Sequence, residues 1–265
     1  MADRKARFPG GAVERSVDGE RLIAVFSSLV EPLGRALPSS SEVVLHDLSL
    51  LPNSIVAIYG DVTGRRIGDP ATDKLLGILS EMADQGGEGA GPGAGGYETV
   101  LPDGRRLRSS TMMIRDVSGA PVAALCINTD LSAWFTAQRV IDMMLGGARD
   151  AAAKPQLSAV PPGPVPVEAG EVFPHDVDEL AALLIQRALD GAGIPVDLMH
   201  KKHKIEVVRD LKARGLFLLR DAVDMVAASL GVTRFTIYNY LNEIADDGED
   251  AGDADDSAQK AQGEQ

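Results

Sequence analysis

The spacing of apolar residues predicts a mixture of helices and strands in the first half of the chain. Apolar residues recur at helical spacing over residues 22–33, and a second helix is predicted over residues 70–84. Runs rich in Val and Ile, separated by turn residues, predict strands over residues 42–48, 54–59, 97–101, 105–115 and 122–129. A third helix is predicted from Asp130, its N-cap, to Leu145. These elements together predict an α+β domain built on an antiparallel sheet.

From residue 176 onward the apolar spacing is helical throughout. A helix begins at Asp176 or Asp178, either of which can cap it. Another helix is predicted over residues 201–214, where Gly215 ends it. Two further helices are predicted within residues 221–245, so the C-terminal part is predicted to be all α-helical.

The last two predicted helices have the pattern of a helix-turn-helix. Gly231 permits the tight turn between them, and Thr233 can cap the second helix. Ile237, Leu241 and Ile244 form the inner stripe of that helix. The pattern leaves a polar and mostly uncharged set facing outward: Thr233, Arg234, Thr236, Tyr238, Asn239 and Asn242.

Outward side chains of these types suit contacts with duplex DNA. Asn bonds well to adenine, Arg bonds well to guanine, and hydroxyl groups bond to bases or phosphates. An ordinary solvated helix face carries more Lys and Glu, so we interpret residues 221–245 as a unit that binds double-stranded DNA. The alternative is a helical hairpin that merely packs against its neighbours.

The net charge of −13 at first argues against a DNA-binding protein. The charge is unevenly distributed, however. Residues 246–265 hold eight acidic residues against Lys260, a net of −7, whereas residues 197–245 hold eight basic and six acidic residues, a net of +2. A mildly basic segment can bind DNA if its positive charge lies on one face. We interpret the acidic end as a solubilising, disordered tail.

Composition divides the chain into two domains, over residues 20–147 and 176–245. We expect a disordered lead over residues 1–19, a Gly-rich surface loop over 86–96, a Pro-rich linker over 148–175 and the acidic tail over 246–265. The single cysteine, Cys126, suits a reducing cytoplasm. The sequence contains neither a signal segment nor an apolar run of about 18 residues, so we expect a cytoplasmic protein that does not contact a membrane.

No residue set in the sequence predicts catalysis or metal binding. Cys126 lies in an apolar strand without a basic neighbour, where a thiol tends to stay protonated. His200 and His203 have a spacing that can bind zinc, but further ligands are lacking nearby, so we interpret them as part of a solvated helix face. We expect no enzyme activity, no metal site and no haem or flavin cofactor.

Polar residues recur on strands that otherwise look like core. Such groups must be satisfied by backbone, by each other or by a bound molecule, because an unpaired buried polar group costs about 1–3 kcal/mol. We predict a small polar ligand in the N-terminal domain, with a carboxylate or amino acid as the class that an Arg, hydroxyls and amides suit. Its predicted contacts are His46, Arg108, Ser110, Asn128 and Asp130.

Six short segments together resemble the regulators in which a YheO-like PAS domain is followed by a helix-turn-helix. They are Glu42-Val-Val-Leu-His-Asp-Leu48, Ser54-Ile-Val-Ala-Ile58, Val62-Thr-Gly-Arg-Arg66 with Gly68-Asp-Pro70, Leu107-Arg-Ser-Ser-Thr111, Ala124-Leu-Cys-Ile-Asn128 with Asp130, and Thr236-Ile-Tyr-Asn-Tyr-Leu241. The resemblance covers about residues 20–145 and 176–245. It implies a PAS-like sensor domain and a transcriptional regulator, in a family that includes repressors of D-arginine use. The Gly-rich loop, the long linker and the acidic tail depart from the family pattern.

We therefore expect a ligand-responsive repressor of a small-molecule operon, with an amino-acid operon as the family resemblance suggests. Most such proteins bind DNA as symmetric dimers, and we expect a homodimer or a higher homo-oligomer, with the helices over residues 20–35 and 130–147 as the candidate contacts. The long linker argues against a rigid lever between the domains, so we expect coupling through the dimer contact. The alternative is a protein-interaction adaptor whose helix-turn-helix no longer binds DNA, which the acidic balance favours.

Overall fold

The computed structural model describes residues 16–84, 96–101, 103–145, 171 and 173–246. The acidic tail beyond Asp246, most of the Gly-rich loop, most of the Pro-rich linker and most of the predicted lead lie outside the described residues. The N-terminal domain contains α1 (Val17–Ala36), β1 (Ser41–Asp47), a short 3-10 turn (Leu48–Leu50), β2 (Ile55–Tyr59), α2 (Asp73–Asp84), β3 (Tyr97–Val100), β4 (Arg106–Arg115), β5 (Pro121–Asp130) and α3 (Ser132–Met144).

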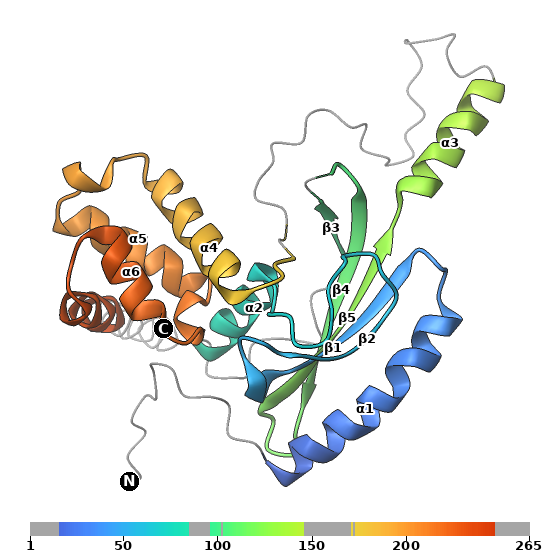
Figure 1. Cartoon of the computed structure of the whole chain (residues 1–265), viewed down its shortest axis with the longest axis horizontal. Coiled ribbons are helices and arrows are strands. Elements are labelled where there is room, and N and C mark those ends of the chain that lie inside the picture. Colours follow the sequence, from blue (N-terminus) through green and yellow to red (C-terminus); the bar gives the residue numbers. More distant parts are fainter. Residues whose placement is uncertain (1–15, 85–95, 102, 146–170, 172, 247–265) are drawn as a thin grey trace, which may run out of the picture.

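The strands form one antiparallel sheet in the order β2-β1-β5-β4-β3 (Figure 1). The predicted α+β fold is thus confirmed. Its central register places Val44 of β1 opposite Cys126 of β5, which in turn lies opposite Thr111 of β4. Since side chains alternate along a strand, these three residues share one face of the sheet, and their sequence neighbours share the other.

One face of the sheet is apolar and is covered by α1. Val43, Leu45 and Leu125 of the sheet pack with Val30 of this helix in one buried cluster. Ser16 caps the helix by accepting a hydrogen bond from the Gly19 backbone N–H at 2.9 Å. The helix therefore begins within the segment predicted as a disordered lead.

Two predicted boundaries shift in the structure. Asp130 is the last residue of β5, and α3 begins only at Ser132, although the Asp130 carboxylate still accepts a hydrogen bond from the Ser132 backbone N–H at 2.8 Å. The second helix begins at Asp73 instead of residue 70, and Thr72 accepts a hydrogen bond from the Leu75 N–H at its start. Asp130 therefore acts at the start of α3 as expected, two residues before the first helical residue, whereas α2 begins three residues after the predicted start.

The C-terminal domain is helical, as predicted. It contains α4 (Val177–Ala192), a 3-10 turn (Val196–Leu198), α5 (Lys201–Ala213), a second 3-10 turn (Leu216–Leu218), α6 (Ala222–Leu230) and a helix over the described residues 234–246. Asp176 caps α4 by accepting a hydrogen bond from the Glu179 backbone N–H at 2.7 Å. Gly215 follows α5 in the left-handed conformation that favours glycine, with a φ of 74°.

The two domains share a hydrophobic core across α2, which lies between the sheet and the helical domain in Figure 1. Leu75 and Leu76 of α2 belong to the same buried cluster as Leu180 and Leu211 of the helical domain. We call this contact between α2 and helices α4 and α5 the domain seam. Contacts distant in sequence thus join the two domains directly, whereas the coupling expected through a dimer contact stays a prediction.

Polar contacts fix the geometry of the domain seam. Ser80 Oγ donates to the Lys212 carbonyl oxygen at 2.7 Å, and Arg187 Nη1 donates to Asp73 Oδ2 at 2.6 Å. A Cβ added at Gly215 would lie 2.4 Å from the Leu76 carbonyl oxygen. At the seam the backbone at Gly215 therefore packs closely against the backbone at Leu76, and there is no room for a side chain at residue 215.

We expect Gly215→Ala to destabilise the protein more than Gly193→Ala does. Both glycines have a left-handed φ, but a Cβ at Gly193 meets nothing within 4 Å. Gly193→Ala should cost about 1–2 kcal/mol for the left-handed conformation. Gly215→Ala should cost about 1–3 kcal/mol more, because the Leu76 backbone has to move. Urea unfolding of the two variants measures the difference, and an equal loss of stability in both would show that the seam is not tightly packed.

Candidate DNA interface and candidate ligand cavity

The helix over residues 234–246 is held by an apolar stripe against the rest of its domain. Ile237, Tyr240 and Ile244 are buried in the cluster that also contains Val226 and Leu230 of α6. The turn before it uses Gly231 with a φ of 61°, as predicted. Thr233 Oγ1 accepts a hydrogen bond from the Thr236 backbone N–H at 3.2 Å, so the predicted cap is present.

The face opposite this stripe carries the residues predicted to contact DNA. Thr233, Arg234, Asn239 and Asn242 are exposed, whereas Thr236 and Tyr238 are partly buried. Phe235 is 75% exposed on the same first turn, and the sequence analysis did not include it. Phe235 was not predicted because only polar residues were considered as DNA contacts. An exposed aromatic ring at this position nevertheless suits apolar contact with a thymine methyl group.

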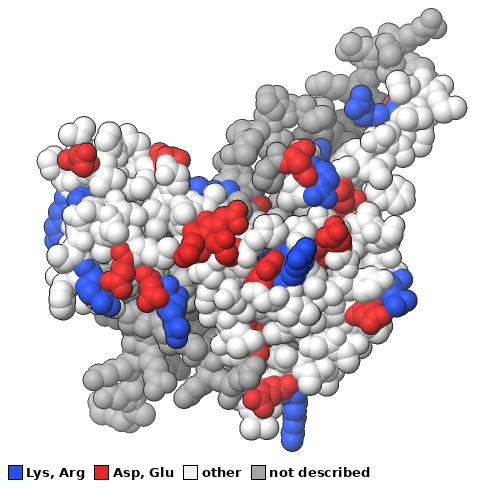
Figure 2. Space-filling model, viewed as in Figure 1, with Lys and Arg blue, Asp and Glu red and all other residues white. Residues whose placement is uncertain are grey.

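The charges near this helix are engaged in exposed ion pairs. Lys201 Nζ lies 2.7 Å from Glu243 Oε2, and Arg234 Nε lies 3.6 Å from Asp224 Oδ1. Basic and acidic side chains are interspersed over the helical domain on the face shown in Figure 2. Exposed pairs of this kind contribute at most about 1 kcal/mol, so a phosphate can replace the acidic partner at little cost.

The face of the sheet opposite α1 is buried but polar. Glu42, at the start of β1, is fully buried. Its carboxylate accepts hydrogen bonds from the backbone N–H groups of Val62 and Thr63 at 3.0 Å, from Thr63 Oγ1 at 2.7 Å and from Asn128 Nδ2 at 3.2 Å. Four donors satisfy this charge, so Glu42 serves to hold the loop after β2 against the sheet.

Arg65, in that loop, is the buried cation of this face and is only partly satisfied. Its side chain is 1% exposed, its Nη2 lies 3.9 Å from Glu42 Oε1, and its Nε donates to Thr63 Oγ1 at 3.2 Å. Its guanidinium lies 4.8 Å from the centre of the Phe173 ring. Arg65 Nη1 and Ser109 Oγ, both buried, have no hydrogen-bond partner among the described residues. We use the name sensor cavity for the group of polar side chains formed by Arg65, Ser109, Thr72, Tyr97 and Thr99.

Glu171, from the end of the predicted linker, reaches the sensor cavity. Thr72 Oγ1 donates to Glu171 Oε1 at 2.7 Å, and Thr99 Oγ1 donates to Glu171 Oε2 at 3.4 Å. Burial raises the pKa of the Glu171 carboxyl, whereas the Thr72 hydrogen bond and the Arg65 charge lower it. Phe173, two residues later, packs on Val62 and Leu107. The end of the linker thus covers the polar face of the sheet.

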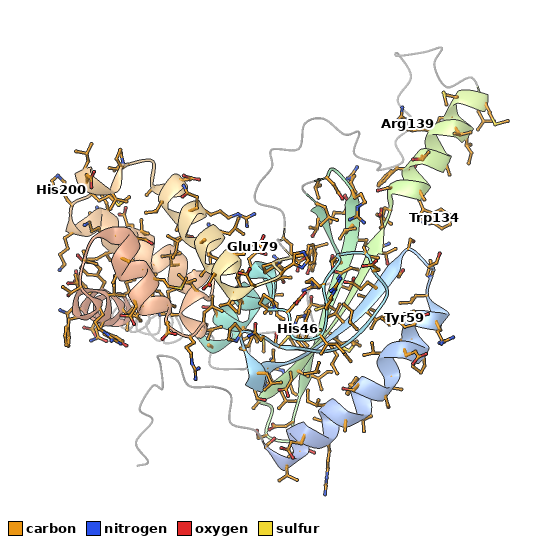
Figure 3. All side chains as sticks on the ribbon, viewed as in Figure 1. His46, Tyr59, Trp134, Arg139, Glu179 and His200 are labelled. Carbon is orange, nitrogen blue, oxygen red and sulfur yellow. The ribbon has the colours of Figure 1, made fainter. Side chains whose placement is uncertain are left out.

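The structure brings together only part of the predicted ligand contacts. His46, labelled in Figure 3, is buried on the polar face, as is Asn128. Asn128 bonds to Glu42, and His46 Nδ1 lies 2.8 Å from Ser54 Oγ. Asp130 lies at the end of β5, 3.4 Å from an Arg105 nitrogen. By strand alternation, Arg108 and Ser110 lie on the opposite face from Ser109.

The residues that the sequence analysis missed come from outside the strands. Arg65 lies in a loop and Glu171 lies in the Pro-rich segment, so neither shows a strand or helix period that marks it as buried. Glu42 lies in a strand but was interpreted only as part of a family segment. A polar residue in a loop gives no sequence signal of burial, because the loop pattern is polar in any case.

His46 is predicted to make the fold sensitive to acid. Burial, with a further contribution from the Arg65 charge, lowers the pKa of His46 to about 3. Since a free histidine has a pKa of about 6.5, the unfolded chain binds a proton between these values that the folded chain does not. The stabilising effect is complete above pH 6.5 and is lost progressively as the pH falls towards 3.

We therefore expect wild type to lose more stability than His46→Gln between pH 7 and pH 4.5. The difference should be about 2–3 kcal/mol, because each pH unit below 6.5 costs about 1.4 kcal/mol. Urea unfolding of both proteins at the two pH values measures it, and the glutamine variant subtracts the titration of all other groups. Parallel losses in the two proteins would show that His46 titrates normally.

The surroundings of Cys126, His200 and His203 do not indicate a catalytic or metal-binding role for these residues. Cys126 is buried, and burial raises the pKa of its thiol to about 11, so the thiol stays protonated near neutral pH. His203 Nδ1 accepts a hydrogen bond from the His200 backbone N–H at the start of α5. Within the described residues, no three His, Cys, Asp or Glu side chains are grouped so that they could hold a metal ion.

Comparison with known families matches both halves of the chain. Residues 17–146 match the YheO-like PAS domain, and residues 180–242 match a helix-turn-helix domain. In the described part of the chain, no helix is long and apolar enough to cross a membrane. The two matches confirm the family resemblance and the helix-turn-helix interpretation of the sequence.

Several full-length proteins are similar to this chain. The transcriptional regulator DauR of Pseudomonas aeruginosa is 28% identical over 79% of this chain and 88% of its own length. The uncharacterised protein YheO of Escherichia coli is 25% identical over 84% of each chain. An uncharacterised protein of Haemophilus influenzae is 23% identical over 88% of this chain and 95% of its own length.

Proposed function

Because the chain is a transcriptional regulator in which a YheO-like PAS domain is followed by a helix-turn-helix domain, we propose that it represses a metabolic operon in response to a small polar ligand. The observation that carries the DNA-binding part is the helix over residues 234–246. It presents Arg234, Asn239 and Asn242 to solvent while its other face is anchored in the core. A helix held in this way has the rigidity that base contacts in the major groove need.

Unsatisfied polar atoms in the N-terminal domain support the proposal of a ligand. Arg65 Nη1 and Ser109 Oγ are buried without partners among the described residues, next to hydroxyls and a carboxylate. Native proteins leave few such atoms unpaired, so a bound molecule is a physical reason for them. An amino-acid operon rests on the family resemblance alone. We place the protein in the cytoplasm, where its DNA target is found.

A homodimer through α3 completes the proposal. None of the residues of α3 is buried, and Trp134, Ile141 and Met144 are 64%, 54% and 83% exposed. The helix extends away from the sheet and from the helical domain (Figures 1 and 3). A 13-residue helix is marginal in water by itself. A second copy of the chain, packed antiparallel or parallel along the same stripe, buries these residues and pairs two DNA-binding helices.

A map of the DNA bound by this protein across its genome, followed by gel shifts with the recovered fragments, tests the proposal. We expect a small number of sites with inverted half-sites, and tighter binding to them than to unrelated DNA of equal length. Recovery of partner proteins with no enriched DNA would overturn it in favour of the adaptor alternative, which the acidic charge of the chain favours.

A further inference from the structure

The Glu171 side chain occupies a position built for a carboxylate. The hydroxyls of Thr72 and Thr99 donate to its two oxygens, and both residues are buried on the N-terminal domain. Burial raises the pKa of the Glu171 carboxyl, and the nearby positive charge of Arg65 offsets part of this effect. Two hydroxyl donors and a guanidinium are the groups by which proteins recognise free carboxylates. This position therefore has the chemistry of a ligand subsite, although a residue of the same chain fills it.

The subsite has more donors than Glu171 uses. Arg65 Nη1 and Ser109 Oγ have no partner among the described residues, and each belongs to a side chain that is at most 4% exposed. Tyr97, opposite Ser109 in the sheet register, is already engaged, because its hydroxyl bonds to Glu171 and lies 3.4 Å from Thr111 Oγ1. A free small molecule carrying a carboxylate and a second polar group can also satisfy Arg65 Nη1 and Ser109 Oγ, which Glu171 alone does not.

Glu171 also lies at the domain seam. It lines a groove of about 350 Å³ between α2 and helices α4 and α5, together with Asp73, Arg187, Leu184 and Arg214. The Arg187–Asp73 ion pair crosses this groove at 2.6 Å. The chain continues from Glu171 into α4, which begins at Val177. Because only five residues separate Glu171 from Val177, movement of Glu171 away from Thr72 and Thr99 is expected to displace the first turn of α4. Helix α4 contacts α2 in the domain seam.

We propose that Glu171 is an internal ligand that a free small carboxylate, of the amino-acid or aliphatic acid class, replaces in the sensor cavity. Replacement releases Glu171 and Phe173 from the sheet and loosens the domain seam, which changes how the helix-turn-helix is held. The binding step rests on the contacts of Glu171 with Thr72 and Thr99 and on the unpaired atoms of Arg65 and Ser109. Its effect on DNA rests on the proposed function. Glu171 is tethered to the chain, so its carboxylate competes with the free acid at a high local concentration. The free acid therefore needs additional binding free energy, which hydrogen bonds to the donors that Glu171 leaves unused can supply.

Chemical rescue of Glu171→Ala with propionate tests the inference. We expect the variant to melt several degrees below wild type, and tens of millimolar propionate to restore most of the loss. Propionamide, which has the same shape without the charge, should have no effect. Wild type should respond much less to propionate, because its own carboxylate occupies the subsite. Glu81→Ala is the matched control, since Glu81 lines the same groove but is exposed.

A second substitution tests whether the rescue occurs at the proposed subsite. In the Glu171→Ala background, Arg65→Met should abolish the propionate effect. If that double variant does not fold, Thr99→Val removes one donor at nearly constant volume and should reduce the effect. The inference is overturned if folded Glu171→Ala does not respond to propionate. It is also overturned if wild type or Glu81→Ala responds to propionate as strongly as Glu171→Ala does, or if the rescue persists without the Arg65 or Thr99 donor.

Gel shifts on the same proteins separate this inference from the proposed function. If Glu171→Ala binds operator DNA but ignores propionate, the internal-ligand inference fails and the regulator proposal stands. If propionate rescues the variant while no protein binds DNA, the cavity assignment stands and the regulator proposal fails. Operator affinity that changes with propionate in Glu171→Ala, and not in Glu81→Ala, supports the link between the cavity and DNA binding.

Discussion

Replacement of Asn239 or Arg234 by alanine is expected to weaken specific DNA binding by about 1–3 kcal/mol each, roughly 5- to 150-fold in affinity. Both side chains are exposed on the helix over residues 234–246, beside the buried Ile237. Neither contributes to the core, so the loss should appear in DNA binding and not in folding. Arg234 first has to leave its exposed contact with Asp224, 3.6 Å away, which costs little in water.

Gel shifts with a specific fragment and with unrelated DNA of equal length measure both affinities. Gln186→Ala and Arg21→Ala are the matched controls, since they remove an exposed amide on α4 and an exposed guanidinium on α1. Both controls should bind as wild type does. Wild-type affinity in Asn239→Ala and in Arg234→Ala, with circular dichroism unchanged, would contradict the assignment of this helix to DNA recognition.

A charge placed on the apolar stripe of α3 is expected to separate a dimer into monomers and to lower operator affinity at least about tenfold, since two linked half-site contacts become one. The variant is Ile141→Lys with Met144→Lys. Both residues are exposed, so the fold of each copy should be retained, because surface substitutions usually change stability by no more than about 0.5 kcal/mol. Analytical ultracentrifugation measures the mass in solution, and gel shifts measure the affinity.

Thr136→Lys adds a charge to the same helix at an exposed position on the side away from Trp134 and Ile141, and is the control for this pair of substitutions. It should remain a dimer. If the double variant also remains a dimer, α3 is not the contact. The exposed apolar residues of α1, namely Val25, Leu29 and Leu33, then become the interface to test. A wild-type protein that is monomeric at all concentrations would contradict a homodimer altogether.

The local spacing of apolar residues was sufficient to predict the helices and strands, and to predict that the C-terminal domain is a helix-turn-helix. Strands such as 105–115 and helices such as 201–214 were predicted close to their observed bounds, because one buried face imposes a period of two or of 3.6 residues on the chain. The same reasoning placed Ile237 inside and Asn239 outside on one helix. These features depend on residues a few positions apart, which a sequence displays directly.

The sensor cavity and the domain seam were decided by tertiary structure. Thr72 and Glu171 are 99 residues apart, and Ser80 and Lys212 are 132 residues apart, so no local period relates them. Arg65 and Glu171 lie outside helices and strands, where polar composition is expected whether or not a side chain is buried. Only the packing of α2 against both domains brings these groups together. The sequence by itself determined which faces are apolar; the folded chain determined which buried polar groups meet.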